Sequence, residues 1–429
     1  MIDVLVVGGG PAGSATARRL AMLGCSVLLA ERSTFPRPHV GESLSPGVWV
    51  HFESLDIARQ IERAGFRLSF DTLLRWDGET RRVRAGRPSL IVDRARFDAL
   101  MLDAAREAGV EIAQPVSAEQ VDVTDRGWRI RLSDGRTIDA RFLVDASGRA
   151  SFSRRARRFT AERLIAWHAR CRVARSPAET LVERCGDRWL WGTTLPDGTF
   201  SAMAFGNDSA PMTETLRGST LFGWLAALDT MEPPRAADAT PYVCESPIDE
   251  RSAAAGEAAF AIDPISSSGV QAALGSGIVA AVAINTILNR SENGDAAIAF
   301  YSSHIARAAA QHAKWAADSY GRGGEAESVP VDDDHVDDET LLSANADAQV
   351  VVPTIRDHFV ELAPAIRTAS GNDVAFLGTT ALPPIVASIR PRTPARRIVD
   401  QWSGTLGRDR AEAVLSWLVK ERAVVEERS

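Results

Sequence analysis

Residues 1–32 read MIDVLVVGGGPAGSATARRLAMLGCSVLLAER and contain the motif that decides the fold. Ile2–Val7 is an apolar run rich in β-branched residues, which is typical of a buried strand, and Ser26–Ala30 is a second such run. GGGPAG at positions 8–13 lies between them and precedes Ser14–Leu23, whose pattern is helical until Gly24. This order, followed by an acid at Glu31, is the dinucleotide-binding fingerprint in its required context. We therefore expect a nucleotide whose pyrophosphate lies at the helix amino terminus.

Size and composition indicate an ordinary globular protein of two or three domains, since the chain has 429 residues, 45% of them hydrophobic. The formal net charge of −7 argues against nucleic acid as the main partner. The four cysteines are scattered without a C-x-x-C pair, so neither a disulfide framework nor a metal site is expected. The amino end lacks the basic region of a signal peptide, and the longest apolar stretch, Ile278–Leu288, is too short to cross a membrane. We therefore expect a cytoplasmic protein with no membrane partner.

Strand and helix patterns divide the chain into five segments. Residues 1–159 alternate strands and helices, with some inserted strands, and residues 253–320 return to the same nucleotide-binding domain. Residues 160–252 contain strand-like pieces that predict a mostly antiparallel sheet. Residues 321–349 are rich in Gly, Asp and Glu, which is typical of a solvated acidic linker. Residues 350–429 show the order helix, helix, helix, strand, which favours a small α-rich, winged-helix-like module.

Local signals give individual element boundaries. We expect a helix over Arg96–Gly109, a short strand at Arg136–Ile138 after the Asp134-Gly135 turn, and a separate buried strand at Phe142–Val144. A long helix should run from about Gly269 to Leu288. In the carboxy-terminal module, Thr393-Pro394 should start a helix with proline at its first position.

Three further segments carry a resemblance to a known flavoprotein family. Residues 37–47 read RPHVGESLSPG, residues 93–98 read DRARFD, and residues 256–270 read GEAAFAIDPISSSGV. With the glycine-rich turn, these motifs resemble in order and spacing the FAD-dependent monooxygenase superfamily, in the branch that contains flavin-dependent halogenases and their hydroxylase relatives. The resemblance covers about residues 1–320. It implies an α/β fold in which a Rossmann-like FAD-binding domain is combined with a mostly antiparallel sheet domain for the substrate.

The resemblance also implies a role for each matching residue. Arg94 would reach the flavin side of the pyrophosphate or the ribityl chain, which Asp263 would also bind. Backbone N–H groups at Gly269 and Val270 would face the N1–C2=O edge of the flavin, because a helix amino terminus stabilises negative charge. Glu42 and Ser43 would line the flavin channel, although Glu42 could instead cap a helix from about Pro46. The set expected to bind FAD is Gly8, Gly10, Pro11, Ala12, Gly13, Glu31, Arg32, Glu42, Ser43, Arg94, Asp145, Gly148, Asp263, Pro264, Ser268, Gly269 and Val270.

Two positions depart from the halogenase pattern. Halogenases of this branch carry a lysine that handles hypohalous acid, and Ser69 occupies its place in the matching segment 65–70. Tryptophan halogenases also carry a glutamate where this chain has Ser266. Trp189-Leu190-Trp191 resembles the halogenase Trp-x-Trp element, although two tryptophans could simply pack on one strand face. Because a halogenase needs a cation to bind and orient its oxidant, oxygen transfer is the better interpretation.

The implied reaction is hydroxylation of an electron-rich aromatic ring. By resemblance, NAD(P)H reduces FAD, O₂ adds at the flavin C4a atom, and the hydroperoxide transfers OH to the substrate. His39, beside the flavin loop, and His168, on a strand of the second sheet, are candidate acid–base groups. Either histidine could instead be structural.

The motifs, the missing lysine and the carboxy-terminal module together most resemble the flavoprotein monooxygenases of tryptophylquinone cofactor biogenesis. Members of that family oxygenate the indole ring of a tryptophan within a partner polypeptide, the small-subunit precursor of quinohemoprotein amine dehydrogenase. That modification precedes export from the cytoplasm. The resemblance therefore implies a protein or peptide substrate, with FAD as cofactor, NAD(P)H as reductant and O₂ as co-substrate.

Other functions stay open, because the residues alone, without the family resemblance, indicate only an FAD-dependent aromatic oxygenase. One is a hydroxylase or halogenase of a free or carrier-bound small aromatic substrate. A second, from another class, is a redox-sensing flavin-binding regulator that binds DNA through the winged helix. Asp409, Glu412 and Glu421 in the candidate recognition helix argue against that function. A flavin reductase or prenyl-group reductase is a third.

Overall fold

The computed structural model describes residues 1–173, 175–207, 212–228, 231–321, 336–377 and 380–427. The chain forms two compact units, one made of residues 1–294 and 301–324 and the other of residues 295–300 and 325–429. Each unit has its own hydrophobic core. The units are described separately below.

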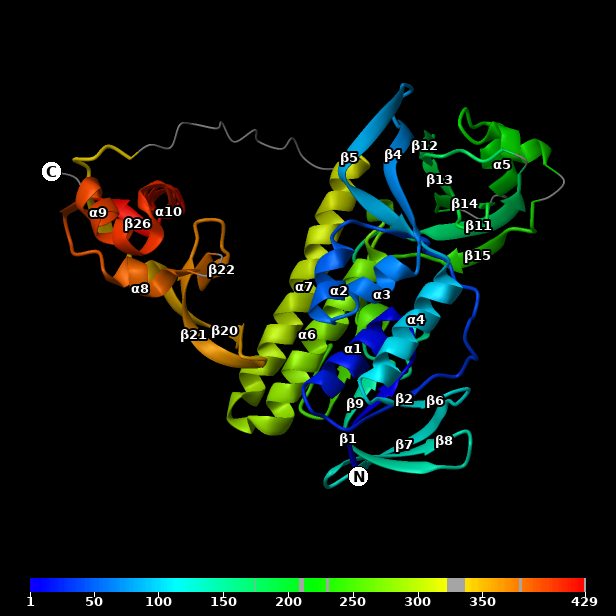
Figure 1. Ribbon diagram of the computed structural model, residues 1–429, viewed down its shortest axis with the longest axis horizontal. Coiled ribbons are helices and arrows are strands. Elements are labelled where there is room, and N and C mark those ends of the chain that lie inside the picture. The colour runs from blue at the N-terminus through cyan, green and yellow to red at the C-terminus, as the bar shows by residue number, and fades with distance from the viewer. Residues whose placement is uncertain (174, 208–211, 229–230, 322–335, 378–379, 428–429) are drawn as a thin grey trace. The chain divides into compact units, whose positions relative to one another are not determined.

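The first unit is built on a parallel sheet that follows the predicted βαβ order (Figure 1). Its strands lie in the order β6-β2-β1-β9, with β17 beside β9, and all of these neighbours pair in parallel. An antiparallel hairpin, β7 and β8, extends the sheet from β9. The bounds are β1 Ile2–Val7, β2 Val27–Ala30, β6 Glu111–Ala113, β7 Ala118–Thr124, β8 Gly127–Leu132, β9 Thr137–Asp145 and β17 Ser252–Ala254.

Three helices pack together beside this sheet, and α1 contacts both α6 and α4. Small residues allow a close approach, since a Cβ at Gly277 of α6 would lie 2.6 Å from the Ala12 carbonyl oxygen of α1. The helix α6 passes a length-and-hydropathy test for a membrane span, but 56% of its apolar window is buried inside the protein, as expected of a core helix. The helices of this unit are α1 Pro11–Met22, α2 Val48–Ser54, α3 Ala58–Arg63, α4 Arg94–Glu107, α5 Met212–Arg217 and α6 Gly269–Asn289; α7, Gly294–Ser319, begins at the unit boundary.

A second, eight-stranded sheet has the order β15-β11-β14-β13-β12-β4-β5-β3 and is antiparallel except between β12 and β4. The prediction of a mostly antiparallel sheet is therefore confirmed. Three of its strands, β3, β4 and β5, come from the first 159 residues, which the sequence placed with the nucleotide-binding domain. The bounds are β3 Ser43–Leu44, β4 Arg67–Arg75, β5 Thr80–Ile91, β11 Ile165–Arg172, β12 Thr180–Cys185, β13 Arg188–Thr194, β14 Thr199–Gly206 and β15 Arg235–Asp238. A small sheet of β10 Arg157–Phe159, β16 Tyr242–Cys244 and β18 Phe260–Ala261 lies apart from it.

Two local predictions need correction. The strands expected at Arg136–Ile138 and Phe142–Val144 are one strand, β9, because the intervening Ala140 pairs with Trp128 on one side and Ile2 on the other. Helix α4 begins at Arg94, two residues earlier than predicted, because the Asp93 carboxylate caps it by accepting hydrogen bonds from the N–H groups of Ala95 and Arg96.

The second unit is less helical than predicted. Its helices follow the expected order with a final strand, but a three-stranded sheet, β20-β21-β22, precedes them. The helix after Thr393 begins at Ala395, so Pro394 is its cap and not its first residue. The bounds are β20 Gln349–Arg356, β21 Phe359–Arg367, β22 Asp373–Val374, β23 Phe376–Leu377, β24 Thr380–Ala381, α8 Leu382–Ala387, β25 Thr393–Pro394, α9 Ala395–Leu406, α10 Arg408–Lys420 and β26 Val424–Glu426.

The segment predicted as an acidic linker contains a strand. Leu341–Ala344 forms strand β19 between β25 and β26, and Leu342 is fully buried in the core of the second unit. Leu342 explains the difference, because its burial stabilises the strand despite the acidic composition around it. Residues 322–335, which hold Asp332-Asp333-Asp334, lie outside the described residues.

Candidate functional site

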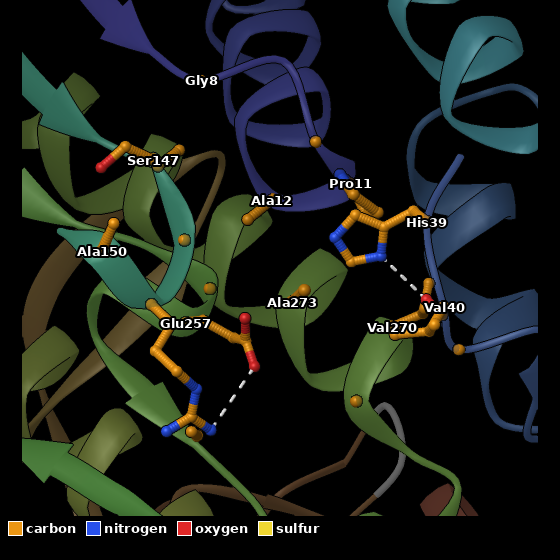
Figure 2. Close-up of a pocket in the computed structure, with 18 of the residues that line it drawn as sticks. Gly8, Pro11, Ala12, His39, Val40, Ser147, Ala150, Glu257, Val270 and Ala273 are labelled. Atoms are coloured by element: carbon orange, nitrogen blue, oxygen red, sulfur yellow. Dashed lines mark hydrogen bonds and ion pairs between the residues drawn. The ribbon is translucent and has the colours of Figure 1, made fainter. Parts of the chain in front are cut away.

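A cavity of ≈ 1020 Å³ lies in the first unit, between the glycine-rich turn, the amino end of α6 and the second sheet. Figure 2 shows His39 beside Pro11 on one wall, with Ser147 and Ala150 on the opposite side. The predicted residues that line the cavity are Gly8, Gly10, Pro11, Ala12, Glu31, Arg32, His39, Glu42, Ser43, Arg94, Gly148, Pro264, Gly269 and Val270. The predicted residues outside its lining are Gly13, Asp145, His168, Asp263 and Ser268.

The glycine-rich turn leaves no room for side chains at two positions. Gly8 has a φ of 110°, and a Cβ there would lie 2.3 Å from the carbonyl oxygen of Ala146. A Cβ at Gly13 would lie 1.8 Å from the carbonyl oxygen of Gly8. Gly10 differs, since the nearest atom to its Cβ position is 3.8 Å away, in the side chain of Arg37. Gly8 and Gly13 therefore shape the turn, while Gly10 leaves the cavity side of it open.

Glu31, the acid that follows β2, binds the backbone of the glycine-rich turn. Glu31 is 5% exposed, and its carboxylate accepts hydrogen bonds from the N–H groups of Gly9, at 2.7 Å, and Ser33, at 2.8 Å. Glu31 also lines the cavity, so its role in binding FAD stays a prediction alongside this contact with the turn.

Arg94 is buried between an acid and a loop. Its guanidinium donates to both carboxylate oxygens of Asp98, at 2.9 and 3.1 Å, and to the Val40 carbonyl at 2.6 Å. Asp98 is fully buried, and Arg37 lies 3.8 Å from its carboxylate. Asp98 orients the Arg94 side chain, and Arg94 in turn binds the loop at Val40. Helix α4 therefore positions the loop that carries Glu42.

Asp145 closes the turn after β9 and does not face the cavity. Its carboxylate accepts hydrogen bonds from the side chains of Ser147, Ser151 and Ser153 and from the N–H groups of Ser147 and Ser153. Burial would raise the pKa of Asp145, but these hydrogen bonds together hold it below its ordinary value. Asp145 therefore shapes the turn whose next residues, including Gly148 and Arg149, line the cavity.

Asp263, predicted to bind the ribityl chain, does not line the cavity. Its carboxylate accepts from the N–H of Ile265, at 3.0 Å, and from the Tyr320 hydroxyl, at 3.2 and 3.3 Å. It thereby caps the short 3₁₀ turn Pro264–Ser266 that leads into α6. Ser268 likewise turns inward to the Ser266 carbonyl, whereas Ser267, in the left-handed region with φ 50°, lines the cavity.

The amino end of α6 offers unpaired donors to the cavity. The first N–H groups of a helix have no partner within it, and the helix dipole makes this end positive. Gly269 and Val270 are the first two residues of α6, and both line the cavity. An anionic group bound there would be stabilised without any charged side chain.

Glu42 is a fully buried acid where the loop meets the second sheet. Its carboxylate accepts from Arg170, at 3.1 Å, from the Ser201 hydroxyl, at 3.3 Å, and from the Gly41 N–H, at 3.0 Å. The alternative that Glu42 caps a helix is wrong, because α2 begins after Gly47 without a side-chain cap. Sequence reasoning missed Arg170 and Ser201, which carry no motif and join the site only through the pairing of β11 with β14.

The two candidate histidines lie in different settings. His168 Nε2 lies 3.2 Å from the Ser201 hydroxyl and 3.8 Å from Glu42. Burial lowers the pKa of His168, an effect that Glu42 opposes and Arg170 adds to. His39 lines the cavity, and its Nδ1 lies 2.9 Å from the Val40 carbonyl. Burial and the nearby Arg94 lower the pKa of His39, so both rings are mainly neutral at pH 7.

An aromatic wall on the second sheet closes one side of the cavity. Trp189, Trp191, Met203 and Phe205 form a buried cluster, and all four line the cavity. Trp189 stacks on Phe205 at 3.9 Å, and its indole N–H donates to Tyr320 at 2.9 Å. The two tryptophans therefore pack on one strand face, as the simpler interpretation predicts, and both line the cavity.

The cavity lining contains no lysine among the described residues. The whole sequence has only two, Lys314 on α7 and Lys420 on α10. Ser69, at the position of the halogenase lysine, is buried, and its hydroxyl lies 3.3 Å from that of Thr180. Cations at the cavity are arginines instead, and sequence reasoning missed Arg37 and Arg149 among them.

The site fits an FAD. Gly8 and Gly13 allow the tight turn, Gly10 leaves the cavity side of the turn open, and the amino ends of α1 and α6 both line the same cavity. Pyrophosphate and an electron-rich flavin edge are the two parts of FAD that helix amino termini stabilise.

Comparison with known proteins agrees with this fit. Residues 3–161 match the family model of FAD dependent oxidoreductases. Tryptophan 2-halogenase from Chondromyces crocatus is 29% identical over 333 residues, covering 70% of this chain and 64% of that protein. Flavin-dependent halogenase armH3 from Armillaria mellea is 36% identical over 162 residues, covering 34% of this chain and 32% of that protein. The chain thus spans less than two thirds of either relative.

Two solved structures match nearly the whole chain. Peptidyl tryptophan dihydroxylase QhpG, essential for tryptophylquinone cofactor biogenesis, superposes with a TM-score of 0.75 at 25% identity, covering 98% of this chain and 99% of that one. The flavin-dependent halogenase CmlS superposes with a TM-score of 0.80 at 18% identity, covering 100% and 96%, which shows a shared fold. The chain is therefore an enzyme with an FAD-dependent oxidoreductase domain. More narrowly, flavin-dependent halogenases are among its homologues, and it shares the fold of QhpG.

Proposed function

We propose that this enzyme is an FAD-dependent monooxygenase that hydroxylates the indole ring of a tryptophan within a partner polypeptide. The partner is the small-subunit precursor of an amine dehydrogenase, and the product leads to its tryptophylquinone cofactor. NAD(P)H is the reductant and O₂ the co-substrate. The reaction takes place in the cytoplasm, before export of the partner.

The observation that carries the choice of oxygen transfer is the side chain at position 69. A serine hydroxyl buried beside Thr180 cannot bind and orient hypohalous acid as an ammonium group does. No other lysine compensates, because Lys314 and Lys420 are both exposed and neither lines the cavity. The chain therefore keeps the flavin site and lacks the cation that halogenation requires.

Bound FAD would supply the redox chemistry, accepting electrons from the reductant and activating O₂. The glycine-rich turn and the first turn of α1 would hold its pyrophosphate, and the amino end of α6 would stabilise negative charge on the flavin ring. The wall of Trp189, Trp191, Met203 and Phe205 would stack the indole and exclude water. His168 does not line the cavity, so neutral His168 would accept the proton that the ring loses by way of Glu42, which lines the cavity and lies 3.8 Å from the His168 Nε2.

A polypeptide substrate is supported by similarity along the whole chain. QhpG, whose described activity is on peptidyl tryptophan, matches 98% of this chain, including the carboxy-terminal unit. The sequence-level resemblance to the tryptophylquinone biogenesis family points to the same substrate class. The carboxy-terminal unit would then be a docking element.

The test is mass spectrometry of a tryptophan-containing small subunit after incubation with the FAD-loaded enzyme, NAD(P)H and O₂ in the presence of chloride and bromide. A gain of one or two oxygen atoms on a tryptophan is the expected result. A parallel reaction with a separate flavin reductase covers the case that the enzyme does not accept NAD(P)H directly. An unmodified polypeptide in both reactions, with free tryptophan or small phenols oxidised instead, would overturn the proposal.

A second candidate is a hydroxylase or halogenase of a free or carrier-bound aromatic compound. It is favoured by the 29% identity to tryptophan 2-halogenase and by Trp189-Leu190-Trp191, which resembles the Trp-x-Trp element of halogenases. The same experiment separates it, because incorporated chlorine or bromine identifies a halogenase and oxygen on a small molecule identifies a small-aromatic hydroxylase.

A further inference from the structure

One row of side chains crosses the second sheet from its open edge to the aromatic wall. The strand registers place each member directly beside the next, on the same face of the sheet. From the edge inward the row is Arg81, Leu74, Val182, Trp191, Met203 and His168. Leu74 and Val182 are both partly exposed, so an apolar path leads from the edge to the cavity.

The edge strand β5 is open over most of its length. Among the described residues, only β3 pairs with its outer side, at Leu90 and Ile91. Every residue from Thr80 to Arg87 is exposed, and β4 and β5 project together as a hairpin (Figure 1). Val83, which pairs with Thr72 next to this row, is an exposed apolar side chain at 43%.

This hairpin is basic although the chain as a whole is acidic. Over residues 67–91, six arginines face three acids. Arg82 and Arg84 pair with Glu179 and Asp71, at 2.5 and 3.2 Å. Within the described part of the chain, Arg81 and Arg87 have no ion-pair partner. Two cations are therefore available to a ligand at the edge that leads to the cavity.

We propose that the open edge of β5 is the docking surface for an extended acidic segment of the polypeptide substrate, with Arg81 as its main charge contact. This inference rests on the proposed function, because it identifies the sequence context of the tryptophan that enters the cavity. An extended segment would enter over the open edge, where its acid would meet Arg81, and would cross the face of the sheet along this row, over Leu74 and Val182, to bring its tryptophan to Trp191.

The geometry of the row fixes the spacing. Neighbouring strands lie about 4.8 Å apart, so Arg81 on β5 and Trp191 on β13, three strands away, are separated by roughly 14 Å. An extended chain advances about 3.3 Å per residue. The target tryptophan should therefore lie about four residues from an Asp or Glu in the substrate.

Arginines on an exposed edge also have a simpler use, since charges there discourage edge-to-edge association of strands. A charge reversal separates the two functions. The substitutions Arg81→Glu and Arg87→Glu keep a charge on the edge and therefore still discourage association of strands. They reverse the sign of the charge that a bound segment meets. The matched control is Arg126→Glu, an exposed arginine in the turn between β7 and β8.

The experiment compares three synthetic peptides that carry one tryptophan and, four residues away, Asp, Ala or Lys. Binding to the FAD-loaded full-length enzyme is measured by fluorescence anisotropy, and oxygen incorporation is measured by mass spectrometry. We expect the wild type and Arg126→Glu to bind the Asp peptide about fivefold more tightly than the Lys peptide, the upper end for one exposed ion pair. Arg81→Glu, alone and with Arg87→Glu, should reverse this preference.

Equal binding of the three peptides by the wild type, or an unchanged preference in Arg81→Glu, would overturn the docking proposal. If the Asp peptide binds in an Arg81-dependent manner but no peptide is oxygenated, the docking surface stands and the proposed reaction fails. If all three peptides are oxygenated with the same kcat/KM, the reaction stands and the docking surface fails.

Discussion

At the scale of single residues, several acids and cations that a flavin motif assigns to the cofactor are already engaged by the protein. Glu31 holds Gly9 and Ser33, Asp145 holds a serine turn, and Asp263 caps a turn and binds Tyr320. The sequence located these residues because acids at such points of the pattern are recognisable. It did not reveal their partners, since a hydrogen bond from Tyr320 to Asp263 joins positions 57 residues apart.

The glycines of the first turn give a matched pair of substitutions. Gly8→Ala should lower the free energy of unfolding by at least 1–3 kcal/mol, about the cost of a strained backbone, because its Cβ also overlaps the Ala146 carbonyl. Gly10→Ala should leave stability almost unchanged, since its Cβ meets only open space and Arg37 at 3.8 Å, yet weaken FAD binding. Urea unfolding of the apoprotein and FAD titration measure the two effects. Equal loss of stability in both variants would contradict this assignment.

The setting of His168 predicts opposite pH shifts for its two charged neighbours. Burial lowers its pKa; Glu42 and Glu232 act to raise it, while Arg170 and Arg235 lower it. If neutral His168 accepts a proton, the acid limb of kcat/KM should lie below pH 6.5. Arg170→Gln removes a cation, so the His168 pKa rises and the limb moves to higher pH. Glu42→Gln removes an anion and should move it to lower pH.

The control for these pH profiles is His168→Gln, which should remove the acid limb altogether. Circular dichroism must show that each variant is folded, because breaking a buried ion pair such as Glu42–Arg170 costs about 3–5 kcal/mol. Profiles that shift in the same direction in both neighbour variants would exclude His168 as the titrating group.

At the scale of elements, prediction succeeded where one periodic signal was strong. The strands of the first βαβ unit and helix α6 lie within one residue of their predicted bounds, because their apolar patterns are uninterrupted, and helix α1 begins at Pro11, three residues before its predicted start. It failed for β4 and β5, whose Arg-rich sequence lacks strict alternation and bulges between Ser69 and Asp71. The sequence analysis also divided β9 into two strands, because Asp139 and Arg141 interrupt its apolar run. In the structure these side chains form ion pairs with Arg129 and Asp3.

The end of helix α7 is tied to the aromatic wall through Tyr320. Its hydroxyl accepts from the indole of Trp189 and donates to Asp263, and its ring lies 6.2 Å from that of Trp76. Tyr320→Phe removes these hydrogen bonds and should cost about 1–3 kcal/mol, since it leaves buried polar groups less satisfied. Urea denaturation measures the loss, and the buried Tyr301→Phe, which removes a single hydrogen bond to the Ala254 carbonyl, is the control expected to lose less.

At the scale of the whole molecule, the division into two units predicts separable unfolding. Trp402 is 4% exposed in the core of the second unit, and its indole N–H donates to Ser388 at 3.1 Å. Trp402→Ala should remove about 3–5 kcal/mol from that unit alone. Calorimetry should then show a transition at lower temperature that releases no FAD, followed by the unchanged transition of the flavin unit. A single shifted transition that also releases FAD would show that the two units unfold together.

Overall stability should fall on mild acidification. Burial, with help from Arg307 and His51, lowers the pKa of His304 to about 4, so the folded state disfavours the charged ring. A folded-state pKa below the unfolded value means that this stabilisation is complete above about pH 6.5 and is lost as the pH falls towards 4. His304 should therefore contribute about 2 kcal/mol of stability loss between pH 7 and pH 5. The variant His304→Asn should flatten that part of the curve, and an unaltered slope would exclude it as a source.

The class of protein and its site were largely within reach of the sequence, whereas the docking edge and the sheet of the second unit were not. A motif with fixed spacing can be recognised in a short stretch of sequence. GGGPAG and DPISSSGV therefore predict residues of the cavity lining without a structure. Arg170 and Ser201 reach the site only because β11 and β14 pair, and Leu342 becomes a core residue only because β25 and β26 flank it. Such long-range pairings carry no local signature.

Because the chain has only two lysines, amine-directed cross-linking can locate a bound polypeptide on it. Apart from the terminal amine of Met1, an amine-directed cross-linking reagent has two side chains to attack, Lys314 and Lys420. Both are exposed, and each belongs to a different unit. A single cross-link to a bound polypeptide therefore reveals which of the two units the polypeptide contacts. Mass spectrometry of the digest has to distinguish only two cross-linked side chains, Lys314 and Lys420.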